Sequence, residues 1–297
     1  MKLNTDDIQA LAQLAQEAAL MASEYIQTKA RESHTIQLKS GVENLATQVV
    51  TAVDIESQRL IIDHLSASLS AYDLGLLTEE LPDDGSRFIK DYFWCIDPLD
   101  GTLPFTEQKA GYAVSIALID QDGTPIIAAV ADPYHQDHWV AIHGSGVQKN
   151  NVPYQFQANT EKLIVQLDRS FLKSDAYEAT VNGLEDICST LGYHDYQIHT
   201  GYGAVMNAMT LLESGSGCYV KWPKVNRGGG CIWDYAATRL IYDELDLPVS
   251  TASGHLIPLN QKDVYMHAHG VIYTTHRTVH QALIQLGKNK IDKQCSI

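Results

Sequence analysis

The sequence predicts an α+β protein whose second half has an α/β pattern. Apolar residues recur at helical spacing in residues 6–30, which indicates one long amphipathic helix. Strand-like apolar runs follow one another between residues 75 and 143, and strands and helices alternate after Asn151. We therefore expect an N-terminal α+β domain over residues 1–152 and a C-terminal α/β domain over residues 153–297.

The first half is expected to begin with two helices. After the helix over residues 6–30, polar residues 39–48 are typical of a mobile loop, and a second helix begins near Asp54. Asp122-Gly123 predicts a hairpin turn between two of the strands that follow. These strands are expected over residues 75–77, 92–96, 112–119, 126–131 and 138–143.

In the second half the hydrophobic period changes repeatedly between that of a strand and that of a helix. This alternation is typical of an α/β arrangement. Strands are expected over residues 163–167, 218–221 and 270–274, and helices over residues 176–191, 204–213, 233–242 and 277–286.

The composition is that of a globular protein, with 45% hydrophobic and 19% charged residues among 297. A formal net charge of −15 argues against a nucleic-acid or membrane partner. We see no signal peptide and no apolar run long enough to cross a bilayer. Five cysteines without a CxxC pair suggest reduced thiols, so a cytoplasmic location is expected.

The most informative segment is residues 97–102, with the sequence Asp-Pro-Leu-Asp-Gly-Thr, directly after the strand expected over residues 92–96. Pro98 fixes its own φ and should end the regular ladder, so that the chain turns. The carboxylates of Asp97 and Asp100 can then point into one small volume. Hard cations such as Mg²⁺ prefer oxygen ligands of this kind and leave positions for water and phosphate.

The end of this segment suits an anion. Gly101 allows a close approach of the backbone to a ligand, and free N–H groups at the start of a following helix would attract a phosphate. The hydroxyl of Thr102 could hold a water molecule. Taken alone, however, the segment is explained equally well as a turn with Asp and Pro in ordinary turn positions.

Two further acidic clusters lie where a metal site would need them. Glu79 and Glu80 end a short apolar run upstream of the strand that carries Asp97, and Asp234 begins an alanine-rich helical run far downstream. Each cluster has a simpler explanation by itself. The two glutamates can belong to a solvated loop, and Asp234 can be a helix N-cap.

In combination, these segments resemble the motifs of the inositol monophosphatase superfamily. Residues 51–54, 78–80, 96–102 and 233–237 have the types and the order seen in that family, which includes inositol monophosphatases, 3'(2'),5'-bisphosphate nucleotidases and fructose-1,6-bisphosphatase-like enzymes. The resemblance covers most of the chain. It implies a layered α-β-α-β-α sandwich, a homodimer, and Mg²⁺-dependent hydrolysis of a small soluble phosphomonoester between the two halves.

The resemblance also implies a set of metal ligands, most of them in the first domain. Glu79, Asp97 and the carbonyl of Leu99 would bind one Mg²⁺ ion. Asp97, Asp100 and Asp234 would bind a second, and a third, weaker ion would lie near Glu79. Four carboxylates crowded together repel one another without cations, so the metal-free site should be disordered or have raised carboxylate pKa values.

Catalytic roles are implied for Asp54, Thr102 and Glu79. The Thr102 hydroxyl would hold the attacking water and would be hydrogen-bonded to Asp54. Substrate contacts are implied for Gly101, Thr102, Gly203, Lys221 and Asp234.

The chain departs from the family pattern in the region that selects the substrate. Leu103 and Pro104 after the motif match neither the inositol monophosphatases nor the bisphosphate nucleotidases, and the segment 221–230 contains extra basic residues and glycines. Inositol monophosphate and 3'-phosphoadenosine 5'-phosphate are the leading substrate candidates. The basic loop slightly favours a second anionic group, although a solvated surface loop explains it equally well.

Two alternatives to this function remain. A regulatory or binding protein could keep the fold and act through partners, but it would have little reason to keep the acidic positions and Thr102 together. A phosphatase with an aspartate nucleophile would need an Asp-x-Asp pair, whereas this chain has Asp97 and Asp100 with Pro98 between them.

Overall fold

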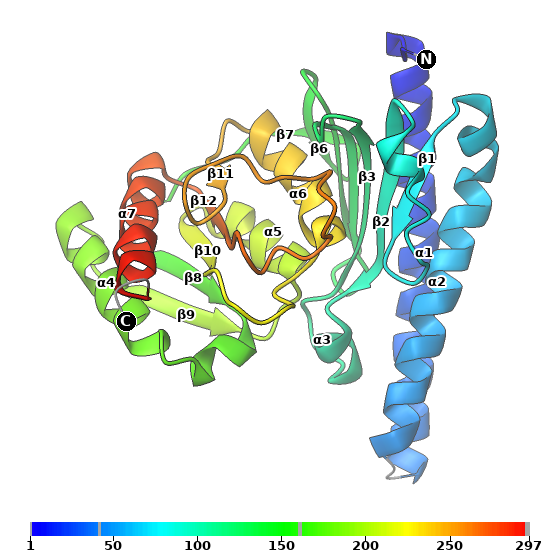
Figure 1. The fold of residues 1–297 in the computed structure, drawn as a ribbon. Coiled ribbons are helices and arrows are strands. Elements are labelled where there is room, and N and C mark those ends of the chain that lie inside the picture. The colour runs from blue at the N-terminus through cyan, green and yellow to red at the C-terminus, as the bar shows by residue number, and fades with distance from the viewer. Residues whose placement is uncertain (1, 41–42, 160–161, 295–297) are drawn as a thin grey trace.

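The computed structural model has five alternating layers of helices and sheets (Figure 1). It describes residues 2–40, 43–159 and 162–294, and the side chains of residues 33–51 and 289–294 are outside the description. Helices α1 (Thr5–Ser40) and α2 (Glu43–Ala71) cover one face of the first sheet. Helices α5 (Ala204–Ser214) and α6 (Ile232–Glu244) lie between the two sheets. This order confirms the expected α-β-α-β-α sandwich.

The first sheet has seven strands in sequence order. Strand β1 pairs in parallel with β2, and every later neighbour is antiparallel. The 3₁₀ helix η1 (Ser86–Phe88) connects β1 to β2, and the short helix α3 (Thr102–Thr106) follows β2. The strands are β1 (Gly75–Thr78), β2 (Tyr92–Asp100), β3 (Ala113–Asp120), β4 (Pro125–Asp132), β5 (Asp137–Ile142), β6 (Gly146–Lys149) and β7 (Val152–Tyr154).

The second sheet has five strands in the order β11-β12-β10-β8-β9. Strand β8 is parallel to β9 and β10, whereas β12 is antiparallel to β10 and β11. Helices α4 (Tyr177–Leu191) and α7 (Arg277–Gln294) form the outer layer, with the 3₁₀ helix η2 (Arg169–Lys173) after β8. The strands are β8 (Leu163–Leu167), β9 (Tyr196–Thr200), β10 (Gly217–Lys221), β11 (Val249–Ser250) and β12 (Val271–Thr274).

Strand β2 has apolar side chains on both of its faces, because the first sheet lies between two layers of helices. Phe93 and Cys95 belong to the core shared with α5, α6 and the second sheet. Trp94 and Ile96 belong to the core under α1 and α2. Successive side chains of a strand point to opposite faces, so this continuous apolar run fills two cores. A third core lies between the second sheet and the outer helices.

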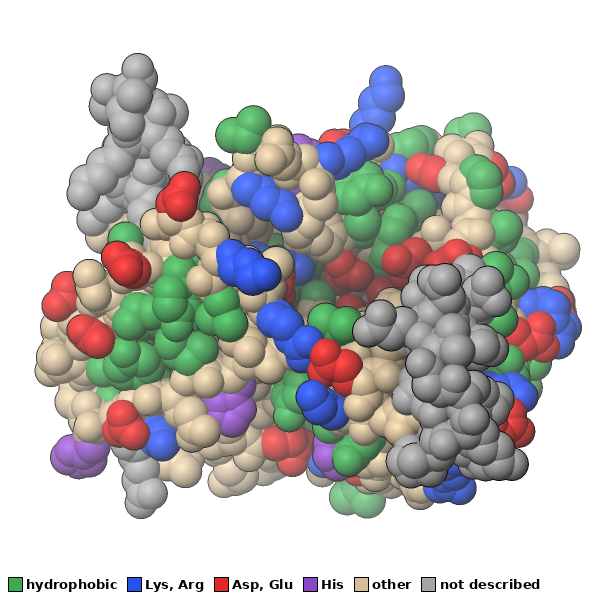
Figure 2. All heavy atoms as spheres, turned by 90° about the horizontal axis from the view of Figure 1, so that it is seen from below, with side chains coloured by type: hydrophobic (Ala, Val, Ile, Leu, Met, Phe, Trp, Pro, Cys, Tyr) green, Lys and Arg blue, Asp and Glu red, His purple; other side chains and the backbone are tan. Residues whose placement is uncertain are grey.

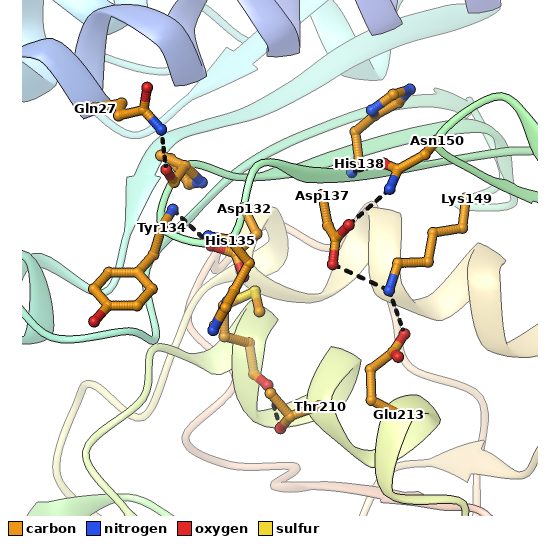
Figure 3. A network of polar contacts seen from close by, with 12 residues as sticks. Gln27, Asp132, Tyr134, His135, Asp137, His138, Lys149, Asn150, Thr210 and Glu213 are labelled. Carbon is orange, nitrogen blue, oxygen red and sulfur yellow. Dashed lines mark hydrogen bonds and ion pairs between the residues drawn. The ribbon is translucent and has the colours of Figure 1, made fainter.

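Polar contacts join the first sheet to α5 at the edge of the central core. Lys149 Nζ lies 3.0 Å from an Asp137 carboxylate oxygen and 2.9 Å from a carboxylate oxygen of Glu213 on α5 (Figure 3). The Tyr154 hydroxyl donates to the carbonyl of Leu212, also on α5, at 3.0 Å. The first sheet is therefore held to α5 by polar side chains as well as by the apolar core. The division into domains at residue 152 stays a prediction.

Several local expectations were wrong. Residues 39–48 were expected in a loop, but residues 39–40 belong to α1 and residues 43–48 to α2, and residues 41–42 lie outside the described part of the chain. Strand β2 was expected to end at residue 96 but continues to Asp100, while its regular pairing with β3 is interrupted between Asp97 and Asp100, as expected from Pro98. Strands β6, β7, β9 and β11 were not expected, since they are short and rich in polar residues. Among the described residues, no helix combines the length and apolar character that a membrane span needs.

Candidate active site

Parallel pairing of β1 and β2 places their ends side by side. Thr78 is aligned with Ile96, and the next residue, Glu79, donates its backbone N–H to the Ile96 carbonyl at 3.3 Å. Glu79, which follows the last residue of β1, and Asp97 of β2 therefore lie side by side, because the two strands run in the same direction. This topology joins two acidic segments that the sequence places 18 residues apart.

Because strand β2 is irregular here, the carboxylates of Asp97 and Asp100 point toward the same space. Asp97 and Asp100 lie on either side of the register shift, and both are buried. An Asp97 carboxylate oxygen accepts the backbone N–H of Leu99 at 3.1 Å, and the Pro98 carbonyl accepts the Ser57 hydroxyl at 2.9 Å. These two bonds fix the path of the chain between the carboxylates.

Asp100 is held by the first turn of α5. Its carboxylate oxygens accept the backbone N–H groups of Ala204 at 3.0 Å and Val205 at 2.8 Å. A side chain on Gly203 would collide with this carboxylate, since a Cβ there would lie 2.2 Å from an Asp100 oxygen. Gly203 was expected to contact the substrate, and the structure places it directly against Asp100.

Asp234 enters the site from the first turn of α6. It was weighed as an N-cap, but the N-cap is Cys231 and Asp234 is the third residue of the helix. Its carboxylate accepts the backbone N–H of Cys231 at 2.7 Å, as in a capping box. The helix start therefore fixes the direction of the Asp234 side chain.

The three aspartates form one cluster, the acidic triad of Asp97, Asp100 and Asp234. Each offers a carboxylate oxygen, and these oxygens lie within 4.8 Å of one another. Burial, followed by the charge of Glu79, raises the pKa of Asp97 well above its usual range. Burial and the charge of Asp234 do the same to the pKa of Asp100. Carboxylates with this spacing and this repulsion fit a cation between them.

Glu79 lies beside the triad. Although the residue as a whole is exposed, removal of its carboxyl from water and the charge of Asp234 raise its pKa to about 7. Asp54, on α2, is buried, and its carboxyl has an oxygen without a hydrogen-bond partner. Burial, with a smaller effect from the charge of Glu80, raises the pKa of Asp54 to about 7. The expectation of raised carboxylate pKa values therefore agrees with the structure.

Gly101 and Thr102 begin α3 next to the triad. Gly101 has φ of 86°, and a Cβ there would lie 2.6 Å from the Gly111 carbonyl oxygen, so no other residue fits this turn. Thr102 is exposed. The expected hydrogen bond between Asp54 and the Thr102 hydroxyl is not among the bonds of the described residues, which corrects that detail. The two residues are on separate helices that pack together.

Lys221, at the end of β10, already has two polar partners. Its ammonium lies 3.0 Å from an Asp168 carboxylate oxygen and donates to the Tyr235 hydroxyl at 3.1 Å. The other Asp168 oxygen accepts the Tyr219 hydroxyl at 3.2 Å. Sequence reasoning missed Asp168 and Tyr235. The available signal was that Asp168 directly follows a predicted strand, as Asp97 does.

The face seen from below shows the charge pattern of the site. Acidic side chains gather in a hollow in the middle of that face, and lysine and arginine side chains lie along part of its rim (Figure 2). A cation at the acidic triad would reverse the local sign despite the overall charge of −15.

The comparisons with known proteins decide the family. A family model described as "Inositol monophosphatase family" matches residues 7–291. The chain belongs to this family. The match confirms the resemblance and the expected enzyme class, a phosphoric monoester hydrolase.

Relatives and solved structures agree with this assignment. A histidinol-phosphatase of Chlorobaculum parvum is 27% identical over 245 residues, covering 80% of this chain and 90% of the relative. The 3'(2'),5'-bisphosphate nucleotidase CysQ of Escherichia coli K12 is 29% identical over 191 residues, covering 63% of this chain and 70% of the relative. Inositol monophosphatase II of Staphylococcus aureus has a TM-score of 0.71 at 19% identity, with 93% and 94% covered. That structure supports the fold alone.

The Asp54→Asn variant is expected to have a flatter pH dependence of stability in EDTA. A buried acid with a raised pKa keeps its proton longer in the folded chain than in the unfolded chain. The free energy of unfolding therefore falls as the pH rises from about 4 to about 7. For Asp54 the loss is on the order of 2–4 kcal/mol, and Asn removes it.

Urea unfolding at several pH values between about 4 and 8 measures this effect. Asp63→Asn is the matched control, because Asp63 is exposed on the same helix and pairs with Arg59. In the Asp63→Asn control, the free energy of unfolding should depend on pH as it does in the wild type. An unchanged slope in Asp54→Asn would show that Asp54 titrates normally.

Proposed function

We propose that the chain is a Mg²⁺-dependent phosphatase that hydrolyses a small soluble phosphomonoester. The observation that supports this most is the acidic triad, in which carboxylate oxygens from β2 and α6 lie within 4.8 Å of one another. Buried carboxylates at this spacing are costly without a cation, so their convergence favours a metal site over a structural cluster.

In this proposal Mg²⁺ is held by the residues that the family resemblance implies. Glu79, Asp97 and the Leu99 carbonyl bind one ion, and Asp97, Asp100 and Asp234 bind a second, with a weaker third ion near Glu79. When bound, Mg²⁺ neutralises charge on the phosphoryl oxygens and lowers the pKa of water. The neighbouring N–H groups of Ala204, Val205 and Cys231 keep two of these carboxylates oriented.

Protein groups near the metal site would bind the phosphate, orient the attacking water and accept its proton. The backbone N–H groups of Gly101 and Thr102 bind the phosphate, and the Thr102 hydroxyl orients the attacking water. Asp54 is a candidate proton acceptor, since it has an unpartnered oxygen and a pKa of about 7. Gly203 contributes by leaving room for Asp100.

The substrate is proposed from the relatives that the chain resembles. Their names point to inositol monophosphate, histidinol phosphate and 3'-phosphoadenosine 5'-phosphate. All three are phosphate esters of small alcohols, which fits a site between two halves of one chain. A homodimer is part of the same proposal, and the mass of the protein in solution tests it.

Phosphate release is expected from at least one of these esters with Mg²⁺ and from none with EDTA. The assay uses the three esters, fructose 1,6-bisphosphate and p-nitrophenyl phosphate as a general reporter. Turnover that persists in EDTA would contradict the metal-dependent mechanism. Binding of Mg²⁺ without turnover of any ester would favour the regulatory alternative.

A further inference from the structure

Helix α2 packs against β1 and β2, the strands that lead into the acidic residues of the site (Figure 1). Asp54, Ser57 and Gln58 share one face of this helix, because residues three and four positions apart on a helix are neighbours. All three side chains are buried. Ser57 donates its hydroxyl to the Pro98 carbonyl, between the two aspartates of β2. Gln58 makes the corresponding contact with the segment that carries Glu79.

A single atom of Gln58 holds the chain on both sides of Glu79. The side-chain oxygen Oε1 of Gln58 accepts the hydroxyl of Thr78, and it also accepts the backbone N–H of Glu80 at 3.0 Å. A backbone N–H can only donate, so the amide of Gln58 turns its oxygen to this segment. An amide oxygen has two lone pairs, and both are used here. The two partners therefore fix the orientation of the amide.

Glu79 lies where the chain leaves β1, and the residue as a whole is exposed. Its backbone N–H meets the Ile96 carbonyl at 3.3 Å, which is longer than a typical N–H···O bond. A side chain on an exposed turn loses conformational freedom when it binds a cation, and this loss weakens binding unless the turn is already ordered. The two hydrogen bonds to Gln58 supply that order.

Gln58 accepts these bonds without carrying a charge. A glutamate at the same position could accept both of them, because its carboxyl also offers an oxygen. It would, however, place another negative charge near Glu79 and raise the repulsion within the metal-free site. A buried amide is therefore well suited to hold a carboxylate ligand in place.

We propose that Gln58 is a positioning residue of the metal site, whose amide oxygen orders the backbone around Glu79 before Mg²⁺ binds. The inference rests on the proposed phosphatase function and adds a residue that is not itself one of the proposed ligands. Its effect should fall on the ion that Glu79 helps to bind. The ion proposed for the acidic triad should depend on Gln58 much less.

Gln58→Met tests the inference, because methionine is a flexible side chain of similar length without a strong acceptor. Calorimetric titration of Mg²⁺ into the metal-free protein should show one ion bound about tenfold or more weakly than in the wild type and the other changed by less than about threefold. With p-nitrophenyl phosphate, the Mg²⁺ concentration for half-maximal rate should rise about tenfold, whereas kcat at saturating Mg²⁺ should stay within about threefold of the wild type.

Ser68→Ala is the matched control for a loss of stability alone. Ser68 is buried on the same helix, and its hydroxyl oxygen accepts the Trp94 indole N–H at 3.0 Å, so this variant also removes a bond between α2 and β2. It should lower the unfolding temperature in EDTA, as Gln58→Met should, but keep the wild-type affinity for Mg²⁺. Gln58→Glu is the conservative variant, and it should bind both ions within about threefold of the wild type.

Thr78→Val removes one of the two bonds from the side of β1, and it tests the inference even if Gln58→Met does not fold. Thr78 is buried, and valine has nearly its shape without the hydroxyl. The same ion should bind about threefold or more weakly. The variant with both substitutions should bind Mg²⁺ no more weakly than Gln58→Met, because the two residues act through one contact.

Wild-type affinity for Mg²⁺ in both Gln58→Met and Thr78→Val would refute the inference and show that Gln58 only supports the fold. The proposed phosphatase function would then still stand. Independent, additive losses in the double variant would also refute it. If the wild type bound no Mg²⁺ at all, the proposed metal-dependent function and the inference would fail together.

Discussion

Asp97→Asn is expected to abolish phosphate release and yet make the metal-free protein more stable. Asp97 is a proposed ligand of both main ions, so its loss should lower kcat by roughly 10³-fold or more, equivalent to about 4 kcal/mol. Asparagine keeps the oxygen that accepts the Leu99 N–H, so the turn in β2 should persist. Without metal, the variant loses a buried carboxylate beside Glu79 and Asp234, and we expect a gain of about 1–2 kcal/mol.

Thermal unfolding with Mg²⁺ and with EDTA separates the two effects. Wild type should gain stability from Mg²⁺, whereas Asp97→Asn should start higher in EDTA and gain little. Asp63→Asn again serves as the control, with wild-type kcat and a wild-type response to Mg²⁺. If Asp97→Asn retained turnover or were less stable than wild type in EDTA, the triad would be a structural cluster and not a metal site.

The acidic residues of the site could be predicted because their segments, taken together and in order, resemble the motifs of the family. Asp97 and Asp100 are in one motif at the end of β2, and Glu79 follows the run that becomes β1. Asp234 lies in the first turn of the alanine-rich helix α6. The sequence placed these residues near the ends of predicted elements, and parallel pairing of β1 and β2 brings Glu79 and Asp97 side by side.

The contacts that orient these residues could not be predicted. The N–H groups that hold Asp100 belong to α5, 104 and 105 positions away. Asp168 meets Lys221 only because β8 and β10 are neighbours in a sheet whose strand order does not follow the sequence. The polar residues 39–48 suggested a loop, but many of them are compatible with a helix, and α1 and α2 include all of those that the structure describes.

Gly230→Ala is expected to lower kcat and Mg²⁺ affinity by about 10²-fold, although residue 230 carries no chemistry. Gly230 has φ of 90°, and an added Cβ would lie 2.1 Å from the Tyr235 hydroxyl oxygen and 2.6 Å from an Asp234 oxygen. Relief of this collision must move the loop, the hydroxyl that contacts Lys221, or the Asp234 carboxylate. Each movement changes the site, because the Cys231 N–H and Lys221 hold these groups in place.

Gly144→Ala is a matched control for the backbone alone. Gly144 has φ of 73°, and an added Cβ there would meet no atom within 4 Å. Both variants place alanine in the left-handed region at a cost of about 1 kcal/mol, so comparable losses of stability are expected from this cause. Only Gly230→Ala should also lose activity and metal affinity. Equal activity in the two variants would mean that the loop can move without disturbing Asp234, and the close contact at Gly230 would then have no part in orienting the acidic triad.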